Sequence, residues 1–386
     1  MARGVCARLD FYIKMESYDL RSEIMAKGHK YYIQTNLVPS QKTVVTSVFH
    51  EGSLLSKQVD SFDPSISADA ARLLVREYHE EKKSRINSLL RIKEKLEDVD
   101  DAKSHLKLGE ALFHQSLYRE AMTEVVRALK LGVEESRAFS ILGNSLIAVG
   151  ESDKAIKAFR KGIEISPQYP DLYNDLGCGF MSQKKCGDAV KAFETATEMN
   201  KYYHTAYLNL AIALCLNVVE KQEFELSRGL RGRLKGILTK CLQLRPSLDT
   251  EDFREAMRAV DSERYDVAYE RLSAIKDVGE KISKNHLSLD LYLILKFGSD
   301  NISEEEIDRY VERALRALES NPGYADLQND LGILYTAKCK LYIDKARDSF
   351  QKSLQINRNF KRAEKNLRLT VNDGQGIHLL LKALLD

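Results

Sequence analysis

The chain has 386 residues, of which 44% are hydrophobic and 30% are charged, and its formal net charge is +2. This even balance provides no overall attraction to nucleic acid or to acidic membranes. The six cysteines form no Cys-x-x-Cys pair and no histidine pair flanks them, so we expect no metal and no other cofactor.

Residues 1–16 share no pattern with the sequence that follows and are interpreted as an N-terminal tail, with a start at Met15 as an open alternative. They lack the apolar core of a signal peptide. No apolar run in the chain approaches the roughly 18–20 residues that cross a bilayer. The sequence therefore predicts a cytoplasmic protein.

Residues 17–66 contain four short segments rich in Val, Ile, Tyr and Thr, separated by the turn residues Gly28, Pro39 and Gly52. This composition predicts a four-stranded antiparallel β-meander. Residues 67–101 carry apolar side chains at helical spacing among many charges, which predicts one long connecting helix.

From residue 102 onward, leucine–glycine pairs recur every 34 residues, and an alanine follows each glycine twelve positions later. Small residues let two helices approach closely, while large apolar residues beside them fill the grooves. The packing signature comprises Leu108, Gly109, Ala121, Leu142, Gly143, Ala155, Phe159, Pro167, Leu176, Gly177, Ala189 and Phe193. The phrase YPDLYNDLG at 169–177 reappears as YADLQNDLG at 324–332, and the signature continues there through Leu331, Gly332, Ala346 and Phe350 with a two-residue insertion.

This pattern resembles the tetratricopeptide repeat. The resemblance implies two antiparallel helices per unit and a mostly α fold, a right-handed α-solenoid that follows the β-meander and the long helix. We expect the solenoid to span 102–371 and to be followed by an apolar C-terminal helix at 372–386. Intact repeats are predicted at 102–135, 136–169, 170–203 and 325–360, and degenerate repeats at 204–324.

The resemblance also implies a protein-interaction scaffold or adaptor that binds a peptide or helix in a concave groove lined by the first helices. Among these side chains, Asn144 and Asn174 are uncharged and suited to hydrogen bonding with a peptide backbone. The candidate groove residues are Lys103, Glu110, Arg137, Asn144, Asp171, Asn174, Asp175, Thr205 and Asn209.

Some family members clamp the terminal carboxylate of a chaperone tail with basic and amide side chains. Three of the matching positions here are acidic, namely Glu110, Asp171 and Asp175, and they would repel a carboxylate. The sequence therefore argues against that binding mode.

No catalytic motif is present, so the chain is not expected to be an enzyme. His105 occupies a position that is aromatic in later repeats, which favours a packing role. Two alternatives stay open. Residues 226–246 contain six basic residues and no acid, which would suit a nucleic-acid-linked regulator, although nucleic acid is not the expected partner. Alternatively, the chain is itself a regulatory subunit of an enzyme and docks through the β-meander.

Overall fold

The computed structural model describes residues 18–26, 28–63, 66–279, 287–297, 303–320 and 325–385. The chain divides into two compact units. Unit 1 combines residues 1–99 with residues 285–386, and unit 2 consists of residues 100–284. The unit boundary falls inside the region 102–371 that the sequence assigns to one solenoid. The predicted tail at 1–16 lies outside the described residues.

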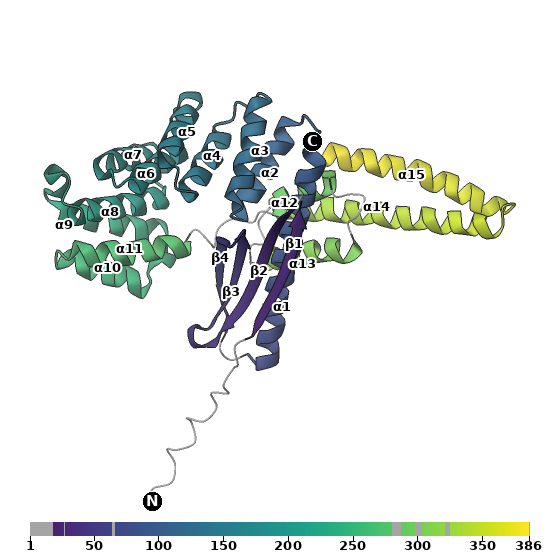
Figure 1. Ribbon diagram of the computed structural model, residues 1–386, viewed down its shortest axis with the longest axis horizontal. Helices are drawn as coiled ribbons and strands as arrows, with labels where there is room; N and C mark the ends of the chain where they lie inside the picture. The colour runs from purple at the N-terminus through teal and green to yellow at the C-terminus, as the bar shows by residue number, and fades with distance from the viewer. Residues whose placement is uncertain are drawn as a thin grey trace, which may run out of the picture. The chain divides into compact units, whose positions relative to one another are not determined.

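Unit 1 begins with the predicted four-stranded antiparallel sheet, whose order is β1-β2-β3-β4 (Figure 1). Its elements are β1 (Asp19–Ala26), β2 (His29–Val38), β3 (Thr43–His50) and β4 (Ser53–Ser61), with a 3₁₀ turn at Pro39–Gln41. Buried side chains alternate with more accessible ones along β2 and β3, as expected when one sheet face is covered.

The covering element is α1 (Ala68–Leu96), which contacts β1, β2 and β3. The Ser67 side chain caps this helix by accepting a hydrogen bond from the Ala70 amide at 3.2 Å. Ala71 and Val75 of α1 form one core cluster with strand residues that include Val44.

One polar group sits within this interface. The His79 ring lies 3.0 Å from the Thr35 hydroxyl through Nδ1 and 2.8 Å from the Ser22 hydroxyl through Nε2. These bonds link α1 to β1 and β2 and satisfy an imidazole that is 2% exposed.

The described residues in the second part of unit 1 form four helices, of which α12 contacts α1. They are α12 (Leu287–Phe297), α13 (Glu304–Ser320), α14 (Ala325–Ile356) and α15 (Lys361–Leu385). The long helices α14 and α15 contact each other and run side by side (Figure 1).

The structure of this region differs from the repeat predicted at 325–360. A repeat requires a turn between two helices, whereas α14 continues without interruption for 32 residues. Gly332 lies on an exposed part of α14, and an added Cβ would meet no atom within 4 Å. The apolar segment 372–386 is likewise no separate helix, because Leu385 ends the same helix that begins at Lys361.

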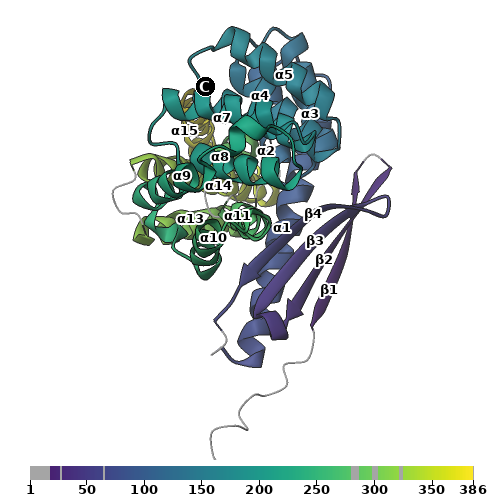
Figure 2. The same cartoon turned by 90° about the vertical axis from the view of Figure 1, so that its left-hand side faces the viewer.

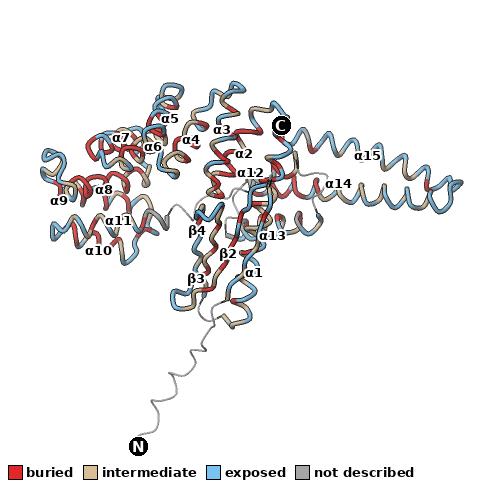
Figure 3. Tube along the Cα trace, in the orientation of Figure 1, coloured by how far each residue is buried: buried red, intermediate tan, exposed pale blue. Residues whose placement is uncertain are grey.

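Unit 2 consists of paired helices, in agreement with the repeat prediction. They are α2 (Ala102–His114), α3 (Tyr118–Lys130), α4 (Ser136–Ala148), α5 (Ser152–Ile165), α6 (Pro170–Ser182), α7 (Cys186–Met199), α8 (His204–Val219), α9 (Leu230–Leu244), α10 (Glu251–Asp261) and α11 (Tyr265–Gly279), with 3₁₀ turns at Phe224–Ser227 and Pro246–Leu248. Helix α8 packs against α7, α9 and α11, and most of its residues are buried (Figure 3).

Close packing between paired helices depends on the signature glycines. A Cβ added at Gly143 would lie 2.2 Å from the ring of Phe159, and one at Gly177 would lie 2.5 Å from the ring of Phe193. Both rings are buried, with exposed fractions of 0% and 1%. A side chain at either glycine would therefore force a buried aromatic ring to shift.

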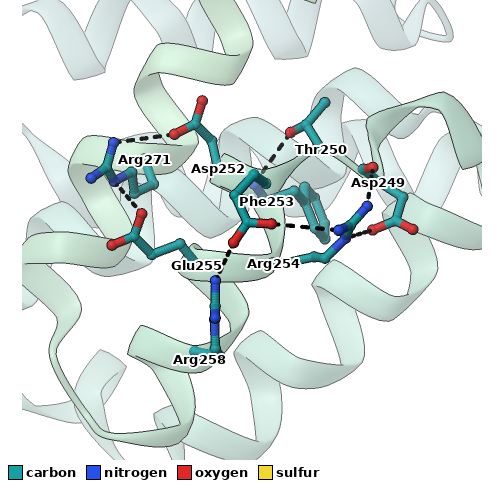
Figure 4. A network of polar contacts seen from close by, with 9 residues as sticks. Asp249, Thr250, Asp252, Phe253, Arg254, Glu255, Arg258 and Arg271 are labelled. Carbon is teal, nitrogen blue, oxygen red and sulfur yellow. Dashed lines mark hydrogen bonds and ion pairs between the residues drawn. The ribbon is translucent and has the colours of Figure 1, made fainter. Parts of the chain in front are cut away.

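The degenerate pair α10–α11 is held by a charged network at its surface (Figure 4). Arg271 of α11 donates to Asp252 at 3.1 Å and pairs with Glu255 at 3.0 Å, while Arg254 pairs with Asp249 at 2.9 Å. Thr250 caps α10 by accepting a hydrogen bond from the Phe253 amide. Exposed ion pairs each contribute little to the free energy of folding, so the network orients α10 and α11 more than it stabilises them.

Candidate partner-binding face

The first helices of successive pairs, α2, α4, α6 and α8, contact one another in order. Polar side chains connect each helix to the next. Arg137 of α4 donates to Glu110 of α2, and the Ser140 hydroxyl of α4 donates to Asp175 of α6. Asn209 of α8 then donates to the Asn174 side-chain oxygen of α6 at 2.8 Å. We call these six side chains the first-helix ladder.

Glu110 forms the charged end of the ladder. Its side chain is 10% exposed and also lies 3.5 Å from the His114 ring, whereas the Arg137 side chain is 58% exposed. Burial alone would raise the pKa of Glu110, but hydrogen bonds and charge from His114 and Arg137 outweigh burial, so the net pKa is lowered. Glu110 is therefore a carboxylate at neutral pH.

Asp171 adds a second negative centre near the ladder. Burial, followed by a hydrogen bond to the Asp171 carboxylate, raises the pKa of Tyr203. Burial and the charge of Asp171 likewise raise the pKa of Tyr169. Both shifts have the direction expected when a phenol faces a carboxylate, because ionising the phenol would place two negative charges together. Asp171 and Asp175 lie one turn apart on α6, so negative charge is concentrated there.

The two asparagines in the centre of the ladder are buried, with exposed fractions of 6% for Asn174 and 2% for Asn209. The Asn209 amide also points toward the Cys178 sulfur at 3.7 Å. Its side-chain oxygen is buried and has no hydrogen-bond partner among the described residues. Asn174 therefore connects two helices instead of forming an open surface group, whereas Asn144 is half-buried and lies 3.5 Å from the Ser140 hydroxyl.

The structure thus brings most of the predicted groove residues together on neighbouring first helices. Lys103 is exposed near the beginning of α2, and Thr205 lies against His204, at 3.4 Å. The sequence interpretation missed Ser140 and Tyr203. Tyr203 carried a usable signal, because it stands 34 residues after Tyr169 and both tyrosines interact with Asp171.

The basic stretch 226–246 contains α9, which begins at Leu230 as the delayed second helix of its pair. Three of its basic side chains pair with acids from neighbouring segments. Lys235 lies 2.7 Å and Arg231 3.8 Å from Asp261, and Arg233 pairs with Glu194. The hydrogen bond from Lys235 lowers the pKa of Asp261. These pairs reduce the net positive charge that a phosphate backbone would require.

His105 is fully buried, and its Nδ1 lies 2.7 Å from the Glu124 carboxylate. A histidine that is 0% exposed offers no face to a substrate, which supports the packing role predicted from its position in the repeat. Among the described residues, no helix has the length and apolar character needed to cross a membrane.

Comparison with known proteins identifies residues 143–178 as a match to the family model described as TPR repeat. No curated protein matches the chain. Among solved structures, MamA is 22% identical over 44% of this chain and 94% of its own, with a TM-score of 0.36. PilF of Pseudomonas aeruginosa is 18% identical over 59% of this chain and 95% of its own, with a TM-score of 0.36.

A further solved structure is YrrB, described as a TPR protein with an unusual peptide-binding site. It is 17% identical over 46% of this chain and 84% of its own, with a TM-score of 0.32. At these identities and TM-scores, no binding property of these proteins extends to this chain.

Proposed function

We propose that this chain, whose residues 143–178 form a tetratricopeptide repeat, is a non-catalytic scaffold that binds a segment of a partner protein along the first-helix face. The observation that carries the proposal is the first-helix ladder. Its polar side chains come from four consecutive first helices. They connect α2 to α4, α4 to α6 and α6 to α8. Faces of this kind accommodate extended segments.

The charge on the face favours a partner segment that carries lysine or arginine. Asp171 and Asp175 lie one turn apart on α6, and Glu110 adds a third carboxylate on α2. Arg137 offsets part of this charge, but its side chain is largely exposed and already paired with Glu110.

Asn144 gives the face a group that both donates and accepts hydrogen bonds, which suits a peptide backbone. It is half-buried beside Ser140, close to the acidic region of α6. Asn174 no longer shares this proposed role, because its side-chain oxygen is engaged by Asn209. The partner would therefore be held by backbone contacts at α4 and by charge at α6.

The cysteines in the described part of the chain are free, which agrees with the proposed reducing, cytoplasmic setting for this scaffold.

The test begins with capture of partners by the tagged full chain, identified by mass spectrometry, and continues with calorimetric titration of the partner. Asp171→Asn with Asp175→Asn preserves side-chain size and removes two charges. We expect about a tenfold or greater loss of affinity, since hydrogen bonds to charged groups contribute about 1.5–3 kcal/mol each.

The matched control is Asp153→Asn with Asp188→Asn. Both residues are exposed and lie in the first turns of the second helices α5 and α7, away from the ladder. This control should bind the partner like the wild type. Unchanged affinity of the Asp171/Asp175 variant would place the partner elsewhere on the chain.

A further inference from the structure

Two hairpin turns lie at the same end of the sheet in unit 1, because β1–β2 and β3–β4 both reverse there (Figure 2). β2 begins at His29, and β3 ends at His50, which lies opposite Tyr31 in the pairing of β2 with β3. Glu51 follows in the tight turn to β4. The antiparallel register therefore gathers His29, His50 and Glu51, which we call the hairpin-end cluster.

One metal-ligand atom from each of these three residues lies within 4.8 Å of the others. The Glu51 carboxylate is 3.7 Å from His29 Nδ1 and 3.9 Å from His50 Nε2. The two imidazole rings have centroids 5.3 Å apart. In a tetrahedral site with bonds of about 2.0–2.2 Å, ligand atoms lie about 3.3–3.6 Å apart. Small side-chain rotations would therefore bring these atoms into coordination distance.

His50 provides a rigid part of the cluster. Its ring stacks on Tyr31 with centroids 4.6 Å apart and an interplanar angle of 15°, and Tyr31 is 3% exposed. The His50 Nε2 atom is buried and has no hydrogen-bond partner in the described structure. A separation of 3.9 Å from Glu51 is too long for a hydrogen bond. A buried ring nitrogen without a partner is unfavourable, and a metal ion would satisfy it.

Glu51 and His29 are the adaptable members, with side chains that are 72% and 58% exposed. Glu51 has a φ of 49° and the following Gly52 has a φ of 78°, which is the pattern of a two-residue hairpin turn with both central residues left-handed. Asparagine, aspartate or glycine usually occupies the first of these positions. Here the turn places a longer carboxylate beside two imidazoles.

We infer that the hairpin-end cluster is a binding site for a divalent transition-metal ion of the zinc class. Imidazole nitrogen suits zinc, copper, nickel and iron, whereas calcium and magnesium prefer oxygen ligands alone. Two histidines and one carboxylate leave a further coordination position for water or for a ligand from another molecule. Bound metal would join the ends of two neighbouring hairpins. This site is independent of the first-helix ladder and of the function proposed for it.

The test uses the full-length protein, stripped of metal with a chelator and titrated with Zn²⁺ against a chromophoric competitor. Glu51→Gln and His29→Gln alter exposed side chains and should leave the fold intact, which circular dichroism verifies. Substituting residues that only hydrogen-bond to metal ligands weakens metal sites about 10–100-fold, so loss of a direct ligand should weaken zinc binding at least about tenfold. His50→Gln should do the same.

The control is His378→Gln, an exposed histidine on α15 outside the cluster, which should bind zinc like the wild type. In NMR spectra, Zn²⁺ should shift the ring resonances of His29 and His50 and leave His378 unchanged, and Ca²⁺ should have no effect. If the wild type binds no zinc, or binds it no more tightly than the Glu51 and His29 variants, the proposal is overturned.

Discussion

The phrase at 169–177 and its near copy at 324–332 begin two different structures. In unit 2 the phrase belongs to α6, a 13-residue helix that ends at Ser182 and turns back into α7. In unit 1 residues 325–332 of the copy begin α14, which continues for 32 residues. The shared residues form a helix in both places, but they do not determine where that helix ends.

The glycines of the two phrases show what is missing in α14. Gly177 faces the buried ring of Phe193 on its paired helix, and a Cβ there would lie 2.5 Å from that ring. Gly332 faces no atom within 4 Å, and Phe350, the equivalent aromatic residue, is only half-buried. A signature residue therefore has its packing role only when the turn returns the second helix onto the first.

The turn itself is the second difference. In the three regular repeats, a residue with positive φ stands seven positions after the signature glycine, at Ser116, Gly150 and Lys184. The equivalent residue after Gly332 is Cys339, which lies inside α14. Alanine, lysine and leucine surround it, and these residues favour continued helix. The two-residue insertion before Ala346 would also shift the second helix out of register with the first.

The largest expected effect comes from one substitution made at both glycines. Gly177→Ala places a methyl group against the Phe193 ring, and overpacking of this kind typically costs about 1–3 kcal/mol. Gly332→Ala adds a methyl group to an exposed helix interior and should stabilise α14 by about 0.5–1 kcal/mol. Urea unfolding of both variants measures the two changes. If both substitutions changed the free energy of unfolding in the same direction, the contrast between α6 and α14 would be contradicted.

A smaller pair of opposite effects is expected at the turn position. Ser116→Gly relieves a left-handed backbone that costs a non-glycine residue about 1 kcal/mol, so the variant should be as stable as the wild type or more so. Cys339→Gly introduces glycine into a helix interior and should cost about 0.5–1 kcal/mol relative to alanine. Cys339→Ala is the matched control. If Cys339→Gly is as stable as Cys339→Ala, position 339 does not lie in a continuous helix.

Acid should produce the smallest effect, which we expect in unit 1 at the buried His79. Burial lowers the pKa of His79, so the unfolded chain, with an imidazole pKa of about 6.5, takes up a proton before the folded sheet does. The sheet therefore keeps its full stability above about pH 6.5 and loses part of it as the pH falls further.

His79→Gln should flatten this dependence in unit 1, measured as the difference in unfolding free energy between pH 7.5 and pH 5.5. Exposed His378→Gln serves as the control. Hydrogen exchange of α6 should be the same in the variant and the wild type, because His79 belongs to the other unit. An unchanged pH dependence in the His79 variant would exclude this histidine as the source.

Local patterns were sufficient to predict the meander and the helix pairs of unit 2. Alternation of β-branched residues between Gly28, Pro39 and Gly52 specifies strands and turns, and the spacing of Gly143 from Phe159 specifies a packed pair. The end of α14 could not be predicted in this way, because the repeat letters persist where the turn is absent.

The candidate sites were predicted less completely than the fold. Charged ladder members such as Glu110 and Arg137 were identified from their places on first helices. Burial of Asn174 was missed, because it depends on how closely α6 approaches α8. The hairpin-end cluster was missed as well, since only strand register brings His29 next to His50. We expected no metal because only cysteine pairs and the histidines near them in the sequence were considered.

The division of unit 1 into two separate stretches of sequence affects how the unit folds during synthesis on the ribosome. Helix α1 contacts α12, and Glu81 and Glu77 of α1 pair with Arg313 and Arg316 of α13. The 185 residues from 100 to 284 are synthesised between these partners. At about 5–20 residues per second, this interval lasts about 10–40 s. The helical repeats of unit 2 thus have time to fold before residues 285–386 of unit 1 are made. During this period the surface of α1 that later contacts α12 is uncovered and available to a chaperone.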